Sequence, residues 1–128
     1  MENGEFGVRE DNVLVQKSFF FAVRIVNLYK YLCRDKKEFV LSKQLLRSGT
    51  SVGANINEAQ DAQSRNDFIS KLSISLKEAR ESKYWIELLK ETDYLTEKET
   101  KSIVEDIIEL IKLLTTIIKT TKEKNAKR

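Results

Sequence analysis

The sequence predicts an all-α protein: an antiparallel up-down-up-down four-helix bundle formed by one domain over residues 1–128. Three observations support this prediction. Apolar residues recur at steps of three and four in four separate segments, which is the spacing of one helix face. Proline, the strongest helix breaker, is absent. A chain of 128 residues is also long enough to bury one core without disulfides or metals.

The first helix is expected to begin after Asp11 or Asn12, either of which is a suitable N-cap, and to end at the charged segment 34–38. Two neighbouring apolar stripes run along it. We expect the first stripe to face the bundle interior as its seam and the second to lie beside it. The first stripe is Val15, Phe19, Ala22, Val26, Tyr29 and Cys33, and the second is Phe21, Ile25, Leu28 and Leu32.

The second helix is expected between Ser42, a suitable cap, and Gln60. Its inward positions are Leu45, Gly49, Val52, Ile56 and Ala59. A glycine costs ~1 kcal/mol relative to alanine inside a helix, so Gly49 and Gly53 indicate close approach to another helix. The small residues of the third helix make that helix the expected neighbour. No lysine follows Gly53, so the segment does not match a phosphate-binding loop.

The third helix is expected to start at a Ser64 cap and to run to about Glu91, and a capping box formed by Thr96 and Glu99 predicts the start of the fourth. The inward positions of the third helix are Phe68, Leu72, Ser75, Ala79, Ser82, Ile86 and Leu89. The fourth carries one seam at Ile103, Ile107, Leu110, Leu114 and Ile117, and a second at Val104, Ile108, Ile111 and Ile118. Doubled stripes are wider than one small bundle needs, so they predict self-association.

Charge is distributed unevenly along the chain. The net charge is +3, but residues 12–90 carry 14 basic and 8 acidic groups while residues 91–118 carry 3 and 7. Residues 119–128 hold five basic groups and one acidic group, and we expect this basic tail and the leader at 1–11 to be flexible. Such polarity either steers the molecule towards an anion or matches charges across a subunit contact.

The composition argues against an enzyme. There is no histidine, which removes the commonest general base and metal ligand, and Cys33 is the single cysteine, so no disulfide forms within one chain. The hydroxyls of Ser48, Thr50 and Ser51 have no base near them in sequence. We therefore expect no catalytic residues, no metal and no cofactor. No apolar run reaches ~18 residues, so we expect a cytoplasmic protein without a membrane span.

Three carboxylates, Glu58, Glu78 and Glu81, leave an alternative open, because they could meet between the second and third helices as an all-carboxylate metal site. We favour ion pairing of Glu58 and Glu78 with Arg47 or Arg80, or capping of the polar groups of Asn55 and Asn57. Asn55 is expected close to the inward face, in a structural hydrogen bond.

Basic residues suggest a nucleic-acid surface. The candidates are Lys17, Arg24, Lys30 and Arg34 on the first helix, with Lys36 and Lys37 leading into the connection, and Arg80, Lys83 and Lys90 on the third. In a ring these residues would repeat once per subunit and give avidity for phosphates. Tyr84 and Trp85 could stack on bases, or Trp85 could fill a gap between helices or subunits. A solvated charged face is the simpler alternative.

The segment "QLLRSGTSVGANINEAQ" (44–60) resembles the Q-x-x-R-[SA]-x-x-S-[VI]-x-x-N-I-x-E-[GA] signature of the four-helix bundle proteins known as 23S rRNA-intervening-sequence proteins. Segments 68–89 and "DYLTEKE" also match, so the resemblance covers about residues 15–118. Ala59 replaces a frequent glycine, and a proline common in the first connection is missing. The residues assigned to the motif and to helix packing are Arg47, Ser48, Gly49, Ser51, Gly53, Asn55, Glu58, Glu78 and Trp85.

The resemblance implies a bundle that assembles into a ring, with pentamers seen in the family, and no enzymatic activity. The family's genes often lie inside intervening sequences of large-subunit ribosomal RNA genes, and a related protein accompanies the reverse transcriptase of diversity-generating retroelements. The partners it suggests are further copies of the chain, RNA or DNA, and a nucleic-acid enzyme, but not a membrane. A protein-protein scaffold that binds no nucleic acid is the alternative function.

Overall fold

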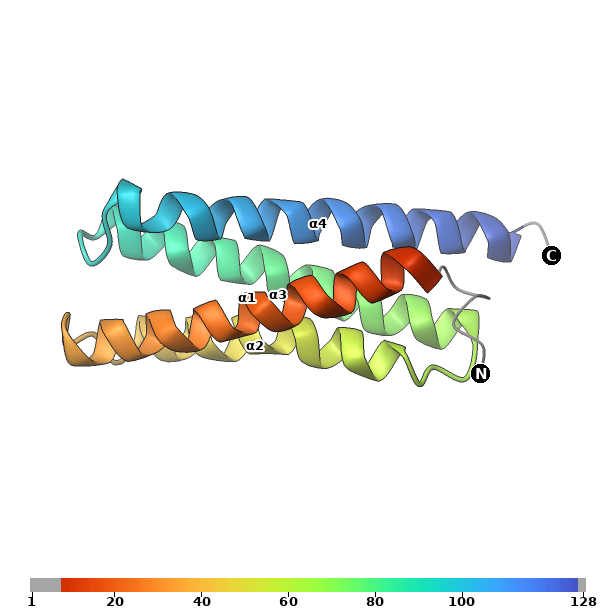
Figure 1. Cartoon of the computed structure of the whole chain (residues 1–128), viewed down its shortest axis with the longest axis horizontal. Coiled ribbons are helices and arrows are strands. Elements are labelled where there is room, and N and C mark those ends of the chain that lie inside the picture. Colours follow the sequence, from red (N-terminus) through yellow and green to blue (C-terminus); the bar gives the residue numbers. More distant parts are fainter. Residues whose placement is uncertain (1–7, 127–128) are drawn as a thin grey trace.

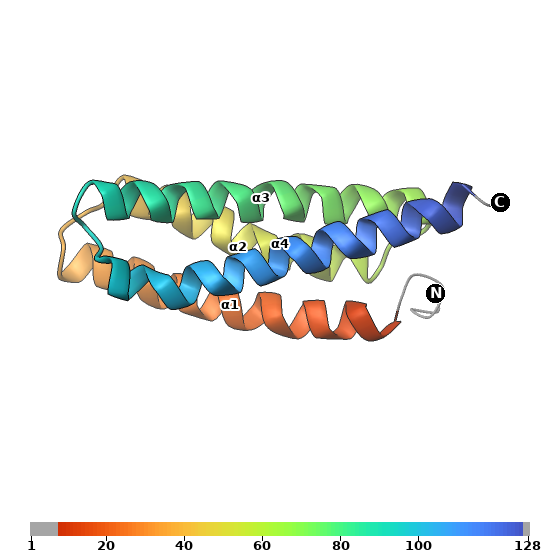
Figure 2. The same ribbon diagram turned by 90° about the horizontal axis from the view of Figure 1, so that it is seen from above.

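Four helices and no strand make up the described residues of this computed structural model, which are 8–126, with side chains described from residue 13. The helices are α1 (Val8–Arg34), α2 (Leu41–Ala59), α3 (Arg65–Glu91) and α4 (Glu97–Ala126). The prediction of an all-helical chain with four helices is confirmed. The α1–α2 and α3–α4 connections lie at one end of the molecule, and the α2–α3 connection lies at the other (Figures 1 and 2).

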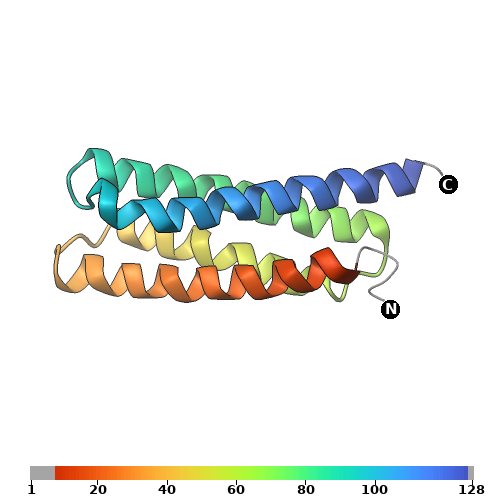
Figure 3. The same cartoon turned by 45° about the horizontal axis from the view of Figure 1, so that its top comes forward.

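Each helix packs against two neighbours. α2 contacts α1 and α3, and α4 contacts α3 and α1. Figure 3 shows the four helices side by side along their length. All seven inward positions predicted for α3 are buried, and so are the five predicted for α2 and the first seam of α4. No described helix is long and apolar enough to cross a membrane.

The caps of α3 and α4 form as predicted. The Ser64 hydroxyl accepts a hydrogen bond from the Asp67 backbone N–H at 3.0 Å. The Thr96 N–H donates to the Glu99 carboxylate at 2.8 Å, and the Glu99 N–H donates to the Thr96 hydroxyl at 3.1 Å. Asp93, two residues after the end of α3, adopts a positive φ of 68°, and the Tyr94 N–H donates to the Leu89 carbonyl, which is the geometry of a Schellman motif.

The start of α2 differs from the prediction, because Glu38 takes the capping role assigned to Ser42. The Glu38 carboxylate accepts hydrogen bonds from the backbone N–H groups of Val40, Leu41 and Ser42 at 3.1, 2.9 and 2.7 Å. Ser42 is buried inside the first turn, where its hydroxyl donates to the Glu38 carbonyl. Burial raises the pKa of Glu38, but the three backbone donors outweigh burial and hold this pKa below its ordinary value.

The stripe assigned as the α1 seam is not the buried one. The buried residues of α1 are Leu14, Ser18, Phe21, Ile25 and Leu32. The second predicted stripe therefore supplies the core. In the first stripe Phe19 is 62% exposed, and the remaining members are only partly buried. Phe20 and Val23 are also exposed, so α1 keeps an apolar outer face in the single chain.

Both glycines of α2 face α1 and not α3, contrary to the prediction. A Cβ added to Gly49 would lie 2.7 Å from Cγ1 of Ile25, and one added to Gly53 would lie 3.3 Å from the carbonyl oxygen of Ser18. Serine side chains make the close contacts between α2 and α3 instead. Ser75 donates to the Val52 carbonyl at 2.8 Å, and the Ser82 hydroxyl lies 2.9 Å from that of Ser48.

The two ends of the described chain are more helical than expected. α1 begins at Val8, before the predicted caps. α4 continues to Ala126, through most of the expected flexible tail. Thr121 is buried one turn beyond Ile117, and its hydroxyl donates to the Ile117 carbonyl. The rest of the predicted leader and tail, 1–7 and 127–128, lies outside the described residues.

Candidate nucleic-acid interface

The two basic residues predicted near the middle of α1 are joined to carboxylates of α4. Arg24 Nη1 lies 2.6 Å from Asp106 Oδ2, and Lys17 Nζ lies 3.2 Å from Glu109 Oε1. All four side chains remain about half exposed, so the pairs add little to stability. The two pairs do neutralise the positive charges of Lys17 and Arg24, which were expected to attract phosphates.

The basic stripe predicted on α3 is partly neutralised as well. Lys83 Nζ lies 3.0 Å from a Glu87 carboxylate oxygen, one turn along the same helix. Lys90 lines a shallow depression against α4 together with Lys101, Glu97 and Glu105, so its surroundings carry both signs of charge. Arg80 is exposed and forms no ion pair among the described residues.

The basic residues at the end of α1 and in the connection after it also form no ion pair among the described residues. Lys30 and Arg34 are exposed, and neither forms an ion pair within the described part of the chain. Lys37 and Lys43, on either side of the α2 start, are also exposed. Lys36 lies 5.8 Å above the Tyr31 ring, whose hydroxyl donates to Glu99 at 2.7 Å. Lys30 and Arg34 therefore lie one turn apart at the end of α1, directly before Lys36 and Lys37 in the sequence.

Most motif residues on α2 have structural contacts. Arg47 Nη2 lies 3.3 Å from Glu81 Oε2, and the same oxygen accepts the Trp85 indole N–H at 3.1 Å. Trp85 thus closes a polar link between α2 and α3, while its neighbour Tyr84 is exposed, with the two rings edge to face at 5.1 Å. Gln44 joins the link through Arg47 at 3.4 Å.

The remaining polar motif residues do not converge on a site. The Asn55 amide donates to the Ser51 carbonyl, and the Ser51 hydroxyl donates to the Arg47 carbonyl, so both bonds lie within α2. Glu58 pairs with Lys71 at 3.4 Å, and not with Arg47 or Arg80 as predicted. The backbone carbonyl of Glu78 accepts the Ser82 hydroxyl. Among the described residues, no group of three acidic or cysteine side chains has the geometry to hold a metal ion.

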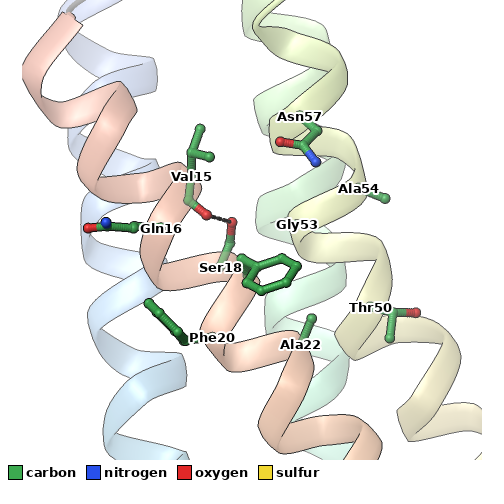
Figure 4. Close-up of a pocket in the computed structure, with 10 residues that line it drawn as sticks. Val15, Gln16, Ser18, Phe20, Ala22, Thr50, Gly53, Ala54 and Asn57 are labelled. Atoms are coloured by element: carbon green, nitrogen blue, oxygen red, sulfur yellow. Dashed lines mark hydrogen bonds between the residues drawn. The ribbon is translucent and has the colours of Figure 1, made fainter.

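An apolar groove of about 440 Å³ runs between α1 and α2 on the outer surface (Figure 4). Its α1 wall contains Val15, Phe19 and Ala22, and its α2 wall contains Gly53 and Ala54. Gly53 lies where the two helices approach closely, since a Cβ there would be 3.3 Å from the Ser18 carbonyl oxygen. Sequence reasoning missed this groove, and it also missed Phe39 and Val40, which are exposed in the α1–α2 connection.

Comparisons with known proteins identify relatives of the chain. A family model described as "23S rRNA-intervening sequence protein" matches residues 10–116. A solved structure from Bacteroides thetaiotaomicron, described as a protein with unknown function from the S23 ribosomal protein family, shares 62% sequence identity and a TM-score of 0.85. The similarity covers 86% of this chain and 98% of that one. No protein with a curated description matches.

Proposed function

Because this chain belongs to the 23S rRNA-intervening sequence protein family, we propose that it is a non-enzymatic cytoplasmic protein that assembles with copies of itself and binds nucleic acid. The assembly is a ring, a pentamer by resemblance to the family, built from antiparallel up-down-up-down bundles. It presents one basic surface per subunit to RNA, to DNA or to an enzyme that acts on them.

The observation that carries the nucleic-acid part is the group of free cations. Lys30, Arg34, Arg80 and Lys90 form no ion pair among the described residues, and the first two lie next to the cations of the α1–α2 connection. One such surface neutralises only a few phosphates and binds weakly. Repetition around a ring would raise the effective concentration of each further contact and convert weak binding into avidity.

The exposed apolar face of α1 supports self-association. Phe19, Phe20 and Val23 are 62%, 62% and 42% exposed in the single chain. Clustered apolar side chains of this size on one helix are typical of a protein-protein contact.

A protein-protein scaffold without nucleic-acid binding is the second candidate. The observation that favours it is the neutralisation of Lys17, Arg24 and Lys83 by Glu109, Asp106 and Glu87. In such a scaffold the other cations would serve only solubility and subunit contacts.

Two measurements test the proposal. Light scattering coupled to size exclusion, with absorbance at two wavelengths, measures the mass of the assembly and any copurifying nucleic acid. Titration of a labelled RNA at several salt concentrations then gives the salt dependence of its affinity. We expect a mass of several chains and an affinity that falls steeply with salt. A multimer that binds no RNA at low salt would favour the scaffold, and a monomer would contradict the ring.

A further inference from the structure

The connection between α1 and α2 carries two exposed apolar side chains at one end of the bundle (Figure 1). Phe39 is 57% exposed and Val40 is 71% exposed. Neither belongs to a helix seam, and neither covers the core. Because an aromatic ring left in water gains nothing for the fold of the single chain, its position suggests contact with another molecule.

Four basic residues flank this pair of apolar side chains in the sequence. Arg34, Lys36, Lys37 and Lys43 are all exposed, and we call these four residues with Phe39 and Val40 the tip surface. The acidic residues within the same stretch are Asp35, which is exposed, and Glu38, whose carboxylate is already occupied by three backbone donors. Residues 34–43 therefore carry a net positive charge, and Glu99 of α4, which accepts from the Tyr31 hydroxyl, offsets that of Lys36.

The backbone under the ring is held in place. The Glu38 N–H donates to the Leu32 carbonyl at 3.0 Å, which ties the connection to the end of α1. The Glu38 carboxylate binds the start of α2, and the Ser42 hydroxyl binds the Glu38 carbonyl at 2.8 Å. Phe39 thus lies between Glu38 and Ser42, whose backbones are held by these hydrogen bonds. A ligand that contacts the ring therefore does not have to order the loop first.

We infer that the tip surface binds single-stranded nucleic acid. An unpaired base stacks on the Phe39 ring, and Arg34, Lys37 and Lys43 contact the phosphates on either side of that base. Proteins that bind single strands combine cations with aromatic rings in this way, because every base presents a flat face. This inference rests on the proposed function and adds where the strand is bound and that it must be single.

Two other partners fit the tip surface less well. In a duplex the bases are stacked on one another, so their faces do not reach a protruding ring. A membrane surface is usually bound through a long apolar helix face, whereas the tip surface offers only Phe39 and Val40.

The test compares substitutions of Phe39 in the full-length chain. The probe is a labelled single-stranded RNA of about 20 nucleotides, longer than the ~4–16 that one single-strand binding fold covers, with the same strand as DNA and the matching duplex alongside. Phe39→Leu keeps an apolar side chain but removes the ring, and Phe39→Tyr keeps the ring. Ile74→Ala is the matched control, because Ile74 is also an exposed apolar residue, at 43%, but lies on α3 and outside the apolar face of α1.

We expect Phe39→Leu to weaken binding of both single strands roughly five-fold or more, and Phe39→Tyr and Ile74→Ala to bind like the wild type. Duplex binding should be unchanged in all variants. Wild-type binding of single strands that Phe39→Leu leaves intact would overturn the inference and leave the proposed function standing. Absence of any nucleic-acid binding would overturn both.

Two further readouts exclude other roles for Phe39. A change in assembly mass for Phe39→Leu by light scattering would place the ring in a subunit contact and overturn the inference. Cosedimentation with phosphatidylserine vesicles that Phe39→Leu abolishes, while its RNA affinity stays intact, would assign the tip surface to a membrane and overturn it too.

Discussion

The backbone of Gly49 lies against the side chain of Ile25, and this contact sets how closely α1 approaches α2. A Cβ at position 49 would meet three side-chain carbons of Ile25 at 2.7 to 3.0 Å. Both residues are buried, so Ile25 has no solvent side to move into. The helix-propensity cost of a glycine is thus offset by close packing at this position.

Gly49→Ala should therefore destabilise the protein although alanine is the better helix former. Overpacking costs about 1–3 kcal/mol and the gain in propensity is ~1 kcal/mol, so we expect a net loss of up to about 2 kcal/mol by urea denaturation. In an Ile25→Ala background the further cost of Gly49→Ala should be smaller, since the effects of residues in contact are not additive. A gain in stability for Gly49→Ala would show that α1 is held less tightly than the geometry indicates.

Glu38 makes stability depend on pH, because its pKa is lower in the folded chain than in the unfolded one. Its contribution is complete above the ordinary pKa of 4.5 and is lost as pH falls through the folded value. Glu38→Gln should cost about 1 kcal/mol at pH 7, the usual effect of weakening a cap. The difference between the variant and the wild type should shrink from pH 5 to pH 3 in urea titrations. A difference that stays constant over that range would contradict the capping role.

At the scale of whole helices, sequence periodicity predicted α3 better than α1, and the reason is physical. α3 has one apolar stripe, so its inward face is unambiguous, and the seven predicted residues are all buried. α1 has two stripes side by side, and periodicity does not say which one meets a neighbour. That choice is made by α2, where Gly49 and Gly53 leave room for Ile25 and Ser18.

The prediction of a flexible basic tail was wrong for residues 119–126, because it rested on the many lysines of this segment alone. Thr121 continues the buried seam one turn past Ile117. Arg65 and Asn66, at the start of α3, bind the Lys124 carbonyl and the Asn125 amide at 3.4 and 2.8 Å. These contacts tie the last turns of α4 to the start of α3.

Deleting residues 119–128 should consequently destabilise the bundle. The deletion removes Thr121 and lets the turn containing Ile117 and Ile118 fray. We expect a loss of about 1 kcal/mol or more, which lowers the melting temperature by roughly 4 °C in a chain of this size. Deletion of residues 127–128 alone is the control and should leave melting unchanged. Identical melting of the two truncated chains would mean that the end of α4 adds nothing to the fold.

Over the whole molecule, the charge pattern of the sequence predicts only part of the candidate interface. The sequence displays basic residues on α1 and acidic residues in 91–118, but it does not show which of them meet. The fold brings Lys17 and Arg24 against Glu109 and Asp106, which removes two of the seven predicted contacts. Lys30 and Arg34, near the end of α1, form no ion pair among the described residues and remain candidate contacts.

The apolar outer face of α1 is expected to form the contact between subunits. Phe19, Phe20 and Val23 contribute little to the core of the single chain, so Phe19→Ser, Phe20→Ser and Val23→Ser together should leave its helical content and melting cooperativity intact. If these residues bury their surface between subunits, the triple variant should become a monomer by light scattering, because each buried apolar side chain supports association by roughly 1.5–3 kcal/mol.

The matched control replaces exposed apolar residues of α3, with Ile74→Ser and Tyr84→Ser, which are 43% and 58% exposed. This control should retain the mass of the wild type. If the α3 variant dissociates and the α1 variant does not, the subunits meet through α3, and the apolar face of α1 remains open to a different partner. If the α1 variant is a monomer and also loses RNA affinity, avidity across the assembly is what makes the weak cationic surface of each subunit effective.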